Sequence, residues 1–328
     1  MLNWGIIGAG IIAEKLADAV RSVEGCRIAA VASKSAQRAE AFAVRNQIET
    51  ACSYAELVDN PDIDVVYVAT THNYHRENVR LALEHGKSVL VEKPFTVNGS
   101  EARDIADLAR DRGLFLMEAM WIRFLPSFRR LQEAVAEGRI GEVRQVSVHF
   151  GKFVQPQFAA RLSDPNLAGG ASLDLGCYPI SFISGILGER PSEVQSMCRL
   201  SDSGVDELDD YSFRYPSGAL AQVCTGFQLF MADRALFYGT QGYIDYPDFQ
   251  GGESFTIHRH DGTNRILASE TITAPRHENG FVYQVQEVKH CLASERTESP
   301  RMPLSESVAL MEVLDRMRED WGLKYPFE

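Results

Sequence analysis

The chain begins with a glycine-rich turn, which is the sequence feature that most restricts its fold. Gly8, Gly10 and Ala13 fit the pattern Gly-x-Gly-x-x-Gly/Ala, between an apolar run at residues 4–7 and helical spacing over 12–20. Gly8 permits a tight turn, and Gly10 lets backbone N–H groups approach a pyrophosphate at the positive end of the helix. The alternative is a plain strand–helix turn of small residues. The strand–turn–helix context favours a dinucleotide site.

The first ~120 residues alternate between strand and helix patterns, as parallel α/β folds do. We expect strands at 4–7, 27–32, 65–69, 88–91 and 114–117, and helices at 12–20, 36–44, 75–85 and 100–112. Ser100 is the expected cap of the last of these helices, and Gly113 its end. Residues 1–121 are therefore predicted to form a Rossmann domain, which is a doubly wound parallel sheet.

After Trp121 the pattern changes to strand-like runs with little helix between them. We expect strands at 143–150, 193–200, 210–215, 219–228, 235–238, 254–259 and 265–273. Helices are expected at 128–137 after a Ser127 cap, at 283–293, and at 305–318 after a Ser305 cap. Residues 122–328 are therefore predicted to form an α+β domain with a large, mostly antiparallel open sheet. The end of the chain is free to pack back across the boundary.

Charge and composition exclude several classes of protein. A chain of 328 residues suits two domains, and 45% hydrophobic residues with 24% charged residues is an ordinary globular mixture. A net charge of −12 argues against a nucleic-acid or anionic-membrane partner, since both favour a basic face.

The cysteines and the N-terminal residues indicate a cytoplasmic protein. Six cysteines are scattered without a CxxC pair, which is typical of reduced thiols. The first residues lack a basic start and a cleavage-like site, so we expect no signal peptide. No run of 18 or more apolar residues occurs, so we expect no membrane span.

The end of the second expected strand bears on the choice between NAD and NADP. An NAD site usually has a carboxylate about 20 residues after the glycines, bound to the ribose 2′-hydroxyl. Here the strand ends in Ser33, Lys34 and Ser35, with Arg38 following. A hydroxyl and two cations suit a 2′-phosphate, so we predict NADP, with NAD as the alternative. Lys34 and Arg38 are otherwise a solvated helix start.

Two further motifs carry groups that could move a proton. Lys93, between Glu92 and Pro94, ends a strand at the expected cofactor edge, where Pro94 restricts it and allows a cis bond. Asp174 and Tyr178 lie four residues apart, on one face if their segment is helical. A nearby lysine would lower the tyrosine pKa toward a useful range. The alternatives are a surface lysine, a capping aspartate and a packed aromatic.

These motifs together resemble the glucose–fructose oxidoreductase/inositol dehydrogenase/MocA (Gfo/Idh/MocA) family over essentially the whole chain. Residues 117–124 (MEAMWIRF) and 174–178 (DLGCY) make the chain most similar to the branch of dimeric dihydrodiol dehydrogenases and NADP-linked D-xylose dehydrogenases. Many relatives have histidine where this chain has Tyr178, which puts an inositol substrate in doubt. The resemblance implies a dehydrogenase acting on CH–OH groups.

The resemblance also implies a role for each matching residue. Tyr178 would be the acid/base, Lys93 would hold the reacting hydroxyl beside the nicotinamide, and Asp174 would contact substrate or Lys93. Trp121 and Arg123 would line the substrate pocket. The full set expected at the cofactor is Gly8, Gly10, Ile11, Ile12, Ser33, Lys34, Arg38, Thr70, Thr71, His72, His75 and Glu92.

The expected reaction is hydride transfer between NADP and a secondary alcohol or hemiacetal of a sugar, a polyol or a trans-dihydrodiol. The alternatives are a non-catalytic NADP-binding regulator, and an enzyme that uses transient oxidation with a tightly bound cofactor. We expect no metal, although His72 with His75 and His258 with His260 are spaced like ligand pairs. An open sheet leaves a face to cover, and the resemblance implies a homodimer or higher oligomer packed sheet to sheet.

Overall fold

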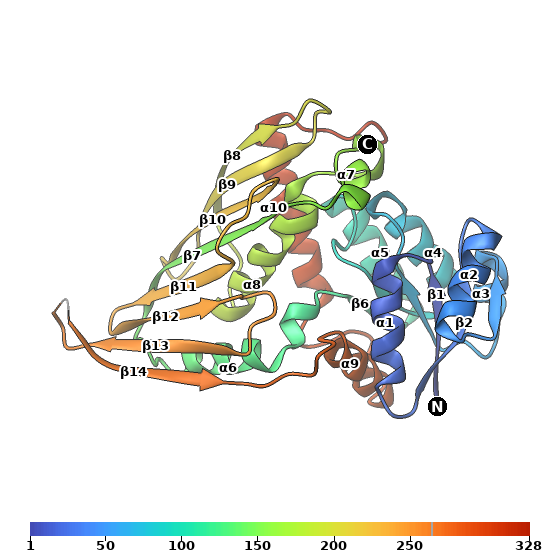
Figure 1. Ribbon diagram of the computed structural model, residues 1–328, viewed down its shortest axis with the longest axis horizontal. Helices are drawn as coiled ribbons and strands as arrows, with labels where there is room; N and C mark the ends of the chain where they lie inside the picture. Colours follow the sequence, from blue (N-terminus) through green and yellow to red (C-terminus); the bar gives the residue numbers. More distant parts are fainter. Residues whose placement is uncertain (264) are drawn as a thin grey trace. The chain divides into compact units, whose positions relative to one another are not determined.

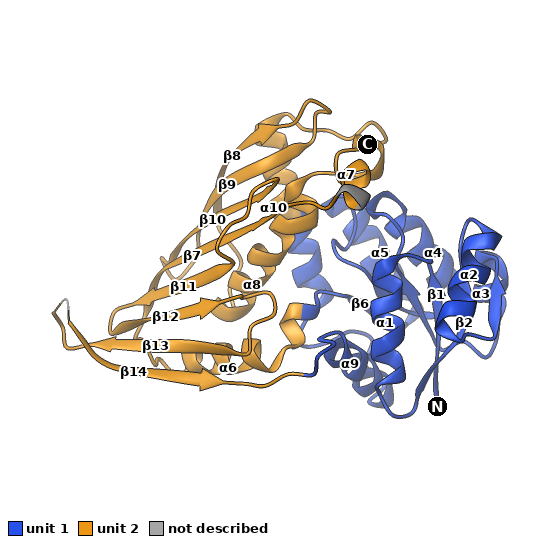
Figure 2. Ribbon diagram, in the orientation of Figure 1, with its two compact units in different colours: residues 1–121, 277–311 blue, residues 122–276, 312–328 orange. Residues whose placement is uncertain are grey.

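The computed structural model describes residues 1–263 and 265–328 and divides them into two compact units (Figure 2). The first unit contains residues 1–121 and 277–311, and the second contains residues 122–276 and 312–328. The sequence pattern placed 277–311 in the second domain, whereas the structure places it within the first unit. This segment bonds to the edge strand of the first sheet, where Leu116 N–H donates to Thr297 O at 3.1 Å.

The first unit is built on a six-stranded parallel sheet with the order β3-β2-β1-β4-β5-β6 (Figure 1). The strands are β1 (Leu2–Ile7), β2 (Cys26–Ala32), β3 (Thr50–Cys52), β4 (Val65–Val68), β5 (Ser88–Val91) and β6 (Leu116–Glu118). The helices are α1 (Ile11–Arg21), α2 (Ala36–Asn46), α3 (Tyr54–Asp59), α4 (His75–Glu84), α5 (Gly99–Arg112) and α9 (Val282–Ala293). This order is that of a doubly wound Rossmann sheet, so the predicted fold is confirmed.

Short polar side chains fix where the helices of the first unit begin. Ser35 accepts a hydrogen bond from Arg38 N–H at the start of α2. Ser53 and Glu56 form a reciprocal capping box at the start of α3. The predicted Ser100 cap of α5 is wrong, because Asn98 accepts from the backbone N–H three residues on and the helix begins at Gly99.

The second unit is built on an eight-stranded sheet with the order β14-β13-β12-β11-β7-β10-β9-β8 (Figure 1). Its strands are β7 (Val143–Lys152), β8 (Glu193–Leu200), β9 (Asp206–Arg214), β10 (Leu220–Phe227), β11 (Arg234–Gly239), β12 (Gly242–Pro247), β13 (Ser254–His260) and β14 (Ile266–Thr273). Neighbouring strands run antiparallel except β7 and β10. The predicted open, mostly antiparallel sheet is confirmed.

Strand β12 was not predicted because Gly242 and Asp245 interrupt its apolar pattern. In the sheet, Asp245 is opposite Leu236 on β11 and forms an ion pair with the nearby Arg234. A charged pair between adjacent strands stabilises a register that local spacing does not show.

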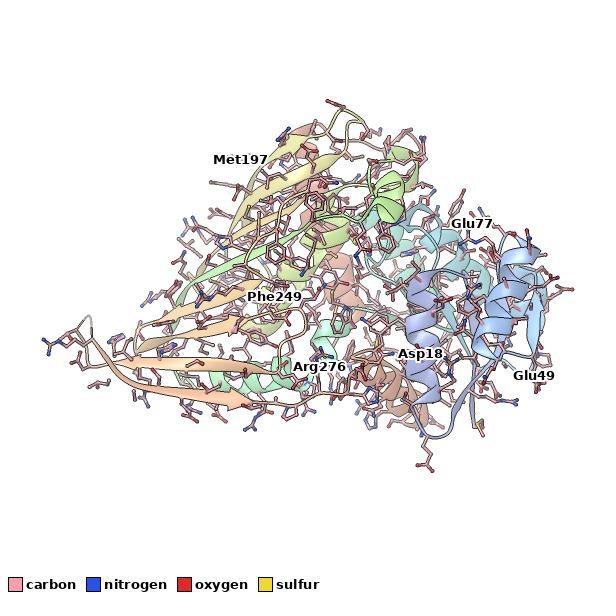
Figure 3. All side chains as sticks on the ribbon, viewed as in Figure 1. Asp18, Glu49, Glu77, Met197, Phe249 and Arg276 are labelled. Atoms are coloured by element: carbon pink, nitrogen blue, oxygen red, sulfur yellow. The ribbon has the colours of Figure 1, made fainter. Side chains whose placement is uncertain are left out.

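Helices cover one face of the second sheet and leave the other open. Its helices are α6 (Pro126–Ala136), α7 (Pro156–Leu162) and α8 (Cys177–Leu187), and the long α10 (Leu304–Trp321) is divided between the units after Met311. Helices α6 and α8 pack on β13 and β7 (Figure 1). Met197 stands outward from β8 on the opposite face, with 71% of its surface exposed (Figure 3). Phe249 is buried, and its ring packs against Phe182 of α8.

Two predicted caps of these helices are wrong. Helix α6 begins at Pro126 with Leu125 as its N-cap, so Ser127 lies inside the first turn. The Ser127 hydroxyl instead accepts a hydrogen bond from Tyr246 OH at 2.6 Å. Helix α10 begins at Leu304, one residue before the predicted Ser305 cap.

One helical stretch passes the length and hydropathy test for a membrane span. Within Pro165–Leu187, an 18-residue window has a mean hydropathy of 1.2, and 83% of that window is buried inside the protein. Burial of this kind is typical of a core helix, because a lipid-facing helix would be exposed.

Candidate functional site

The glycine turn lies at the switch point of the parallel sheet, between β1 and β4. Gly8 has φ +111°, and a Cβ there would lie 2.5 Å from the carbonyl oxygen of Ala69. Gly8 N–H donates to Ala32 O at 2.9 Å, which holds the turn against the end of β2. Only glycine fits this position, because both its backbone conformation and its close approach to β4 exclude a side chain.

The beginning of α1 is shaped to receive a dinucleotide. Gly10 is the N-cap without a side-chain cap, and nothing lies within 4 Å of where its Cβ would stand. The next two side chains, Ile11 and Ile12, are 63% and 36% exposed, which is unusual for isoleucine. An open helix N-terminus flanked by apolar surface fits a pyrophosphate and the groups attached to it.

The end of β2 carries the residues predicted at the 2′-phosphate. Ser33 is half-buried, while Lys34 and Arg38 are exposed. The Lys34 ammonium lies 3.3 Å from the ring centroid of Tyr74, which follows β4. The segments after β2 and β4 are therefore adjacent, and two cations lie at the edge where a 2′-phosphate is expected.

His75 joins the segments that follow β4 and β5. Its Nδ1 lies 2.8 Å from Pro94 O, and its Nε2 lies 3.2 Å from Thr70 O. The ring of His72 packs edge-on against His75 at 5.8 Å. The sequence predicts both histidines beside the cofactor. The structure shows that His75 is buried and contacts the loops after β4 and β5.

Glu92 is fully buried directly before Lys93. It accepts a short hydrogen bond from the Tyr67 hydroxyl, and the Lys93 backbone N–H donates to it at 3.2 Å. Burial raises the pKa of Glu92 to about 7, against the opposing effects of the Tyr67 hydroxyl and the Lys93 charge. The Lys93–Pro94 peptide bond is cis, as the sequence allowed, and the Lys93 side chain is half-buried.

Lys15 is a charged residue of this region that sequence reasoning missed. Its ammonium lies over the rings of Trp121 and Phe281, 4.8 and 4.4 Å from their centroids. Its charge also opposes part of the rise that burial causes in the pKa of Glu92. One signal was present, because Lys15 lies about one turn after Gly10. The indole of Trp121, predicted to line the substrate pocket, thus holds a cation within the first unit.

In the second unit, Asp174 lies in a π-helical segment, Ser172–Gly176, and Tyr178 in the first turn of α8. The segment is helical, but its π-helical turn is wider than the α-helical turn in which residues four apart share one face. Asp174 accepts an ion-paired hydrogen bond from Arg161 at 3.1 Å. The Tyr178 ring packs edge-on against Phe150 at 5.9 Å, with only 6% of the residue exposed.

Arg123, predicted in the substrate pocket, is buried against α8. Its guanidinium donates to Ser181 O at 3.1 Å and lies over the Phe128 ring at 5.3 Å. A Cβ on Gly185 would collide with it, so α8 approaches closely because that position is glycine. Arg123 therefore packs against α8, which follows the segment that carries Asp174. Its contact with substrate stays a prediction.

The predicted site residues fall into two groups. The cofactor residues, Lys93 and Trp121 belong to the first unit, whereas Arg123, Asp174 and Tyr178 belong to the second. A single site that contains both groups stays a proposal. Across residues 1–263 and 265–328, no group of three or more His, Cys, Asp or Glu side chains could hold a metal ion.

Comparison with family models gives two matches, one in each of the two predicted domains. Residues 2–120 match the GFO_IDH_MocA model, described as an oxidoreductase family with an NAD-binding Rossmann fold. Residues 128–245 match the GFO/IDH/MocA C-terminal domain.

Known proteins similar to the chain include enzymes and solved structures. Trans-1,2-dihydrobenzene-1,2-diol dehydrogenase of Mus musculus is 34% identical over 99% of this chain and 98% of its own length. The Bos taurus enzyme of the same name is 33% identical over the same shares. The structure of KijD10, a 3-ketoreductase from Actinomadura kijaniata in complex with NADP, is 27% identical with a TM-score of 0.86 and covers 97% of both chains.

Proposed function

Because the chain belongs to the Gfo/Idh/MocA oxidoreductase family, we propose that it is an NADP-dependent dehydrogenase that oxidises a hydroxyl of a sugar or a trans-dihydrodiol. The similar mammalian enzymes are named for a dihydrodiol, and KijD10 is named a ketoreductase. Both reactions interconvert CH–OH and C=O. The observation that carries the proposal is the presence of Lys93, Asp174 and Tyr178 together with the open glycine turn.

The roles follow from the chemistry of each side chain. When bound, NADP⁺ supplies the hydride acceptor. Tyr178, as the phenolate that a nearby lysine cation favours, takes the hydroxyl proton, and the Lys93 ammonium stabilises the negative charge that develops on the substrate oxygen. Asp174, held by Arg161, orients the substrate. Glu92 lies next to Lys93, and its burial restricts the loop that carries the ammonium.

Preference for NADP over NAD follows from the end of β2. Ser33, Lys34 and Arg38 offer a hydroxyl and two cations, and the strand end has no carboxylate to bind a free 2′-hydroxyl. Steady-state kinetics with both cofactors should give the higher kcat/KM for NADP⁺. A higher value for NAD⁺ would contradict this assignment.

Replacing the proposed proton acceptor and cation tests the reaction directly. Tyr178→Phe and Lys93→Met should each lower kcat by about 10²- to 10⁴-fold, because each removes a group that acts in the transition state. The dissociation constant of NADP⁺, measured by calorimetry, should change little for Tyr178→Phe. Near-normal turnover in both variants would refute the assignment.

The substrate is best found by an NADP⁺ reduction screen over aldoses, polyols and trans-dihydrodiols. The proposal predicts that at least one class gives net NADPH. Bound cofactor without net NADPH, despite conversion of substrate, would instead show transient oxidation. NADP binding without any conversion would show a non-catalytic regulator.

The assembly and location of the protein are part of the same proposal. The open face of the second sheet exposes apolar side chains, including Met197 and Leu220, which a second copy could cover. None of the six cysteines forms a disulfide, a state typical of a reducing compartment. We therefore propose a cytoplasmic homodimer packed sheet to sheet.

A further inference from the structure

The π-helical segment Ser172–Gly176 is bonded at both of its ends to one strand, β9. At its start, Ser172 N–H donates to Asp206 Oδ2 at 2.5 Å. At its end, the carbonyl of Gly176 accepts from the Tyr211 hydroxyl at 3.3 Å. Asp206 and Tyr211 are five positions apart on β9 and are both buried. Asp174 lies between the two bonds, and Tyr178 follows two residues after the second.

A buried polar network connects the two bonds. The carboxyl groups of Asp206 and Asp209 are neighbours, and the Thr225 hydroxyl donates to Asp209 at 3.4 Å. Thr225 also lies beside the Tyr211 hydroxyl. Burial, and then the neighbouring Asp206 charge, raise the pKa of Asp209.

The backbone leading into the segment lies directly against this network. Gly170 has φ +124°, and a Cβ there would collide with Asp206 Oδ1. The residue before it, Gly169, accepts a hydrogen bond from the Tyr325 hydroxyl at 2.6 Å. A Cβ on Gly176 would lie 3.2 Å from the Tyr211 hydroxyl. Glycines at these positions let the segment approach β9 closely, and this close approach determines where the backbone of the segment runs.

We propose that Asp206 and Tyr211 are positioning residues for the reaction: by fixing both ends of the π-helical segment, they aim Asp174 and Tyr178 at the substrate. The inference rests on the proposed function, because it assumes that Asp174 and Tyr178 act there. Asp206 and Tyr211 are not proposed to contact the reacting atoms. Their effect comes through geometry, and a displacement of about 1 Å is enough to lower a rate by about 10²-fold.

Four variants test the inference with the substrate that gives the highest kcat/KM in the NADP⁺ reduction screen. Asp206→Ala removes the bond to Ser172, whereas Asp206→Asn keeps an oxygen that can accept it. Tyr211→Phe removes only the hydroxyl at the other end. The matched control is Tyr215→Phe, which also removes a buried hydroxyl just after β9, but one that lies near Ser184 in the second half of α8.

We expect Asp206→Ala and Tyr211→Phe to lower kcat by about tenfold or more, with the dissociation constant of NADP⁺ within about twofold of wild type. Asp206→Asn should recover most of the kcat lost in Asp206→Ala. Tyr215→Phe should keep kcat within about twofold. Amide hydrogen exchange over residues 170–178 should become faster in Asp206→Ala and Tyr211→Phe but not in the control.

The outcomes separate this inference from the proposed function. Wild-type kcat and unchanged exchange in both Asp206→Ala and Tyr211→Phe would overturn the inference, while a large loss in Tyr178→Phe would still support the reaction. If Asp206→Ala does not fold, Tyr211→Phe alone decides, because it keeps the ring and the fold around it. Absence of NADP-linked turnover in the wild type would overturn the function, and the exchange rates would still show whether β9 fixes the segment.

Discussion

At the scale of single residues, neighbours decide what each side chain of the site can do. A glutamate side chain ordinarily has a pKa near 4.5, but the burial of Glu92 beside Tyr67 raises its pKa to about 7. Arg123 has the charge of a ligand-binding residue, yet it is buried against Ser181 and Phe128. Residue type therefore proposes a role, and the surroundings determine whether the side chain is available for it.

Glu92→Gln should change how stability depends on pH. The folded protein holds the Glu92 proton more tightly than the unfolded chain, so the free energy of unfolding falls as pH rises from about 4.5 to about 7. The shift corresponds to about 3 kcal/mol at most. Gln cannot titrate but still accepts the Tyr67 bond. Urea unfolding at pH 5 and pH 8 should show a smaller loss in the variant, and equal losses would contradict the assigned pKa.

At the scale of elements, close approaches of backbone define both candidate segments. The turn between β1 and α1 touches β4 at Ala69 because position 8 is glycine. The π-helical segment and the backbone leading into it approach β9 closely for the same reason, at Gly176 and Gly170. In each case glycine lets one element come near enough to another to fix where the following residues point.

Gly8→Ala and Gly10→Ala should separate stability from cofactor binding. Ala at position 8 must adopt φ near +111° and meets Ala69 O, so we expect a loss of about 1–3 kcal/mol of folding stability. Ala at position 10 meets open space in an extended conformation, so the melting temperature should stay unchanged. Its methyl group should weaken NADP⁺ binding by about tenfold because it faces the pyrophosphate. Thermal unfolding and calorimetry measure the two effects, and an unstable Gly10→Ala variant would contradict the assigned geometry.

At the scale of the whole molecule, the parallel sheet carries the predicted cofactor residues, and the mostly antiparallel sheet supports Asp174 and Tyr178. The parallel sheet of the first unit brings several loops together at the carboxyl ends of its strands, where His75 braces two of them. The sheet of the second unit supports the π-helical segment on its covered side and leaves its other face exposed. The family assignment made from the motifs is confirmed by matches over both halves.

The exposed sheet face predicts the assembly. Sedimentation of the wild type should show a dimer, and Leu220→Lys, which places a charge on the open face, should increase the monomer fraction. Val44→Lys is the matched control, because Val44 is an exposed apolar residue on α2 of the first unit. A monomeric wild type would exclude the dimer. An equal effect of both variants would exclude this face as the interface.

Residue spacing alone predicts the Rossmann half, the glycine turn and most strands of the second sheet, although not β12. These features are encoded by residues close together in the chain, so spacing alone reveals them. Three features of the site appear only in the folded chain: Asp174 pairs with Arg161, the segment Ser172–Gly176 is π-helical, and Ser172 bonds to Asp206, 34 residues away. Such contacts depend on which distant segments meet, and local patterns do not contain that information.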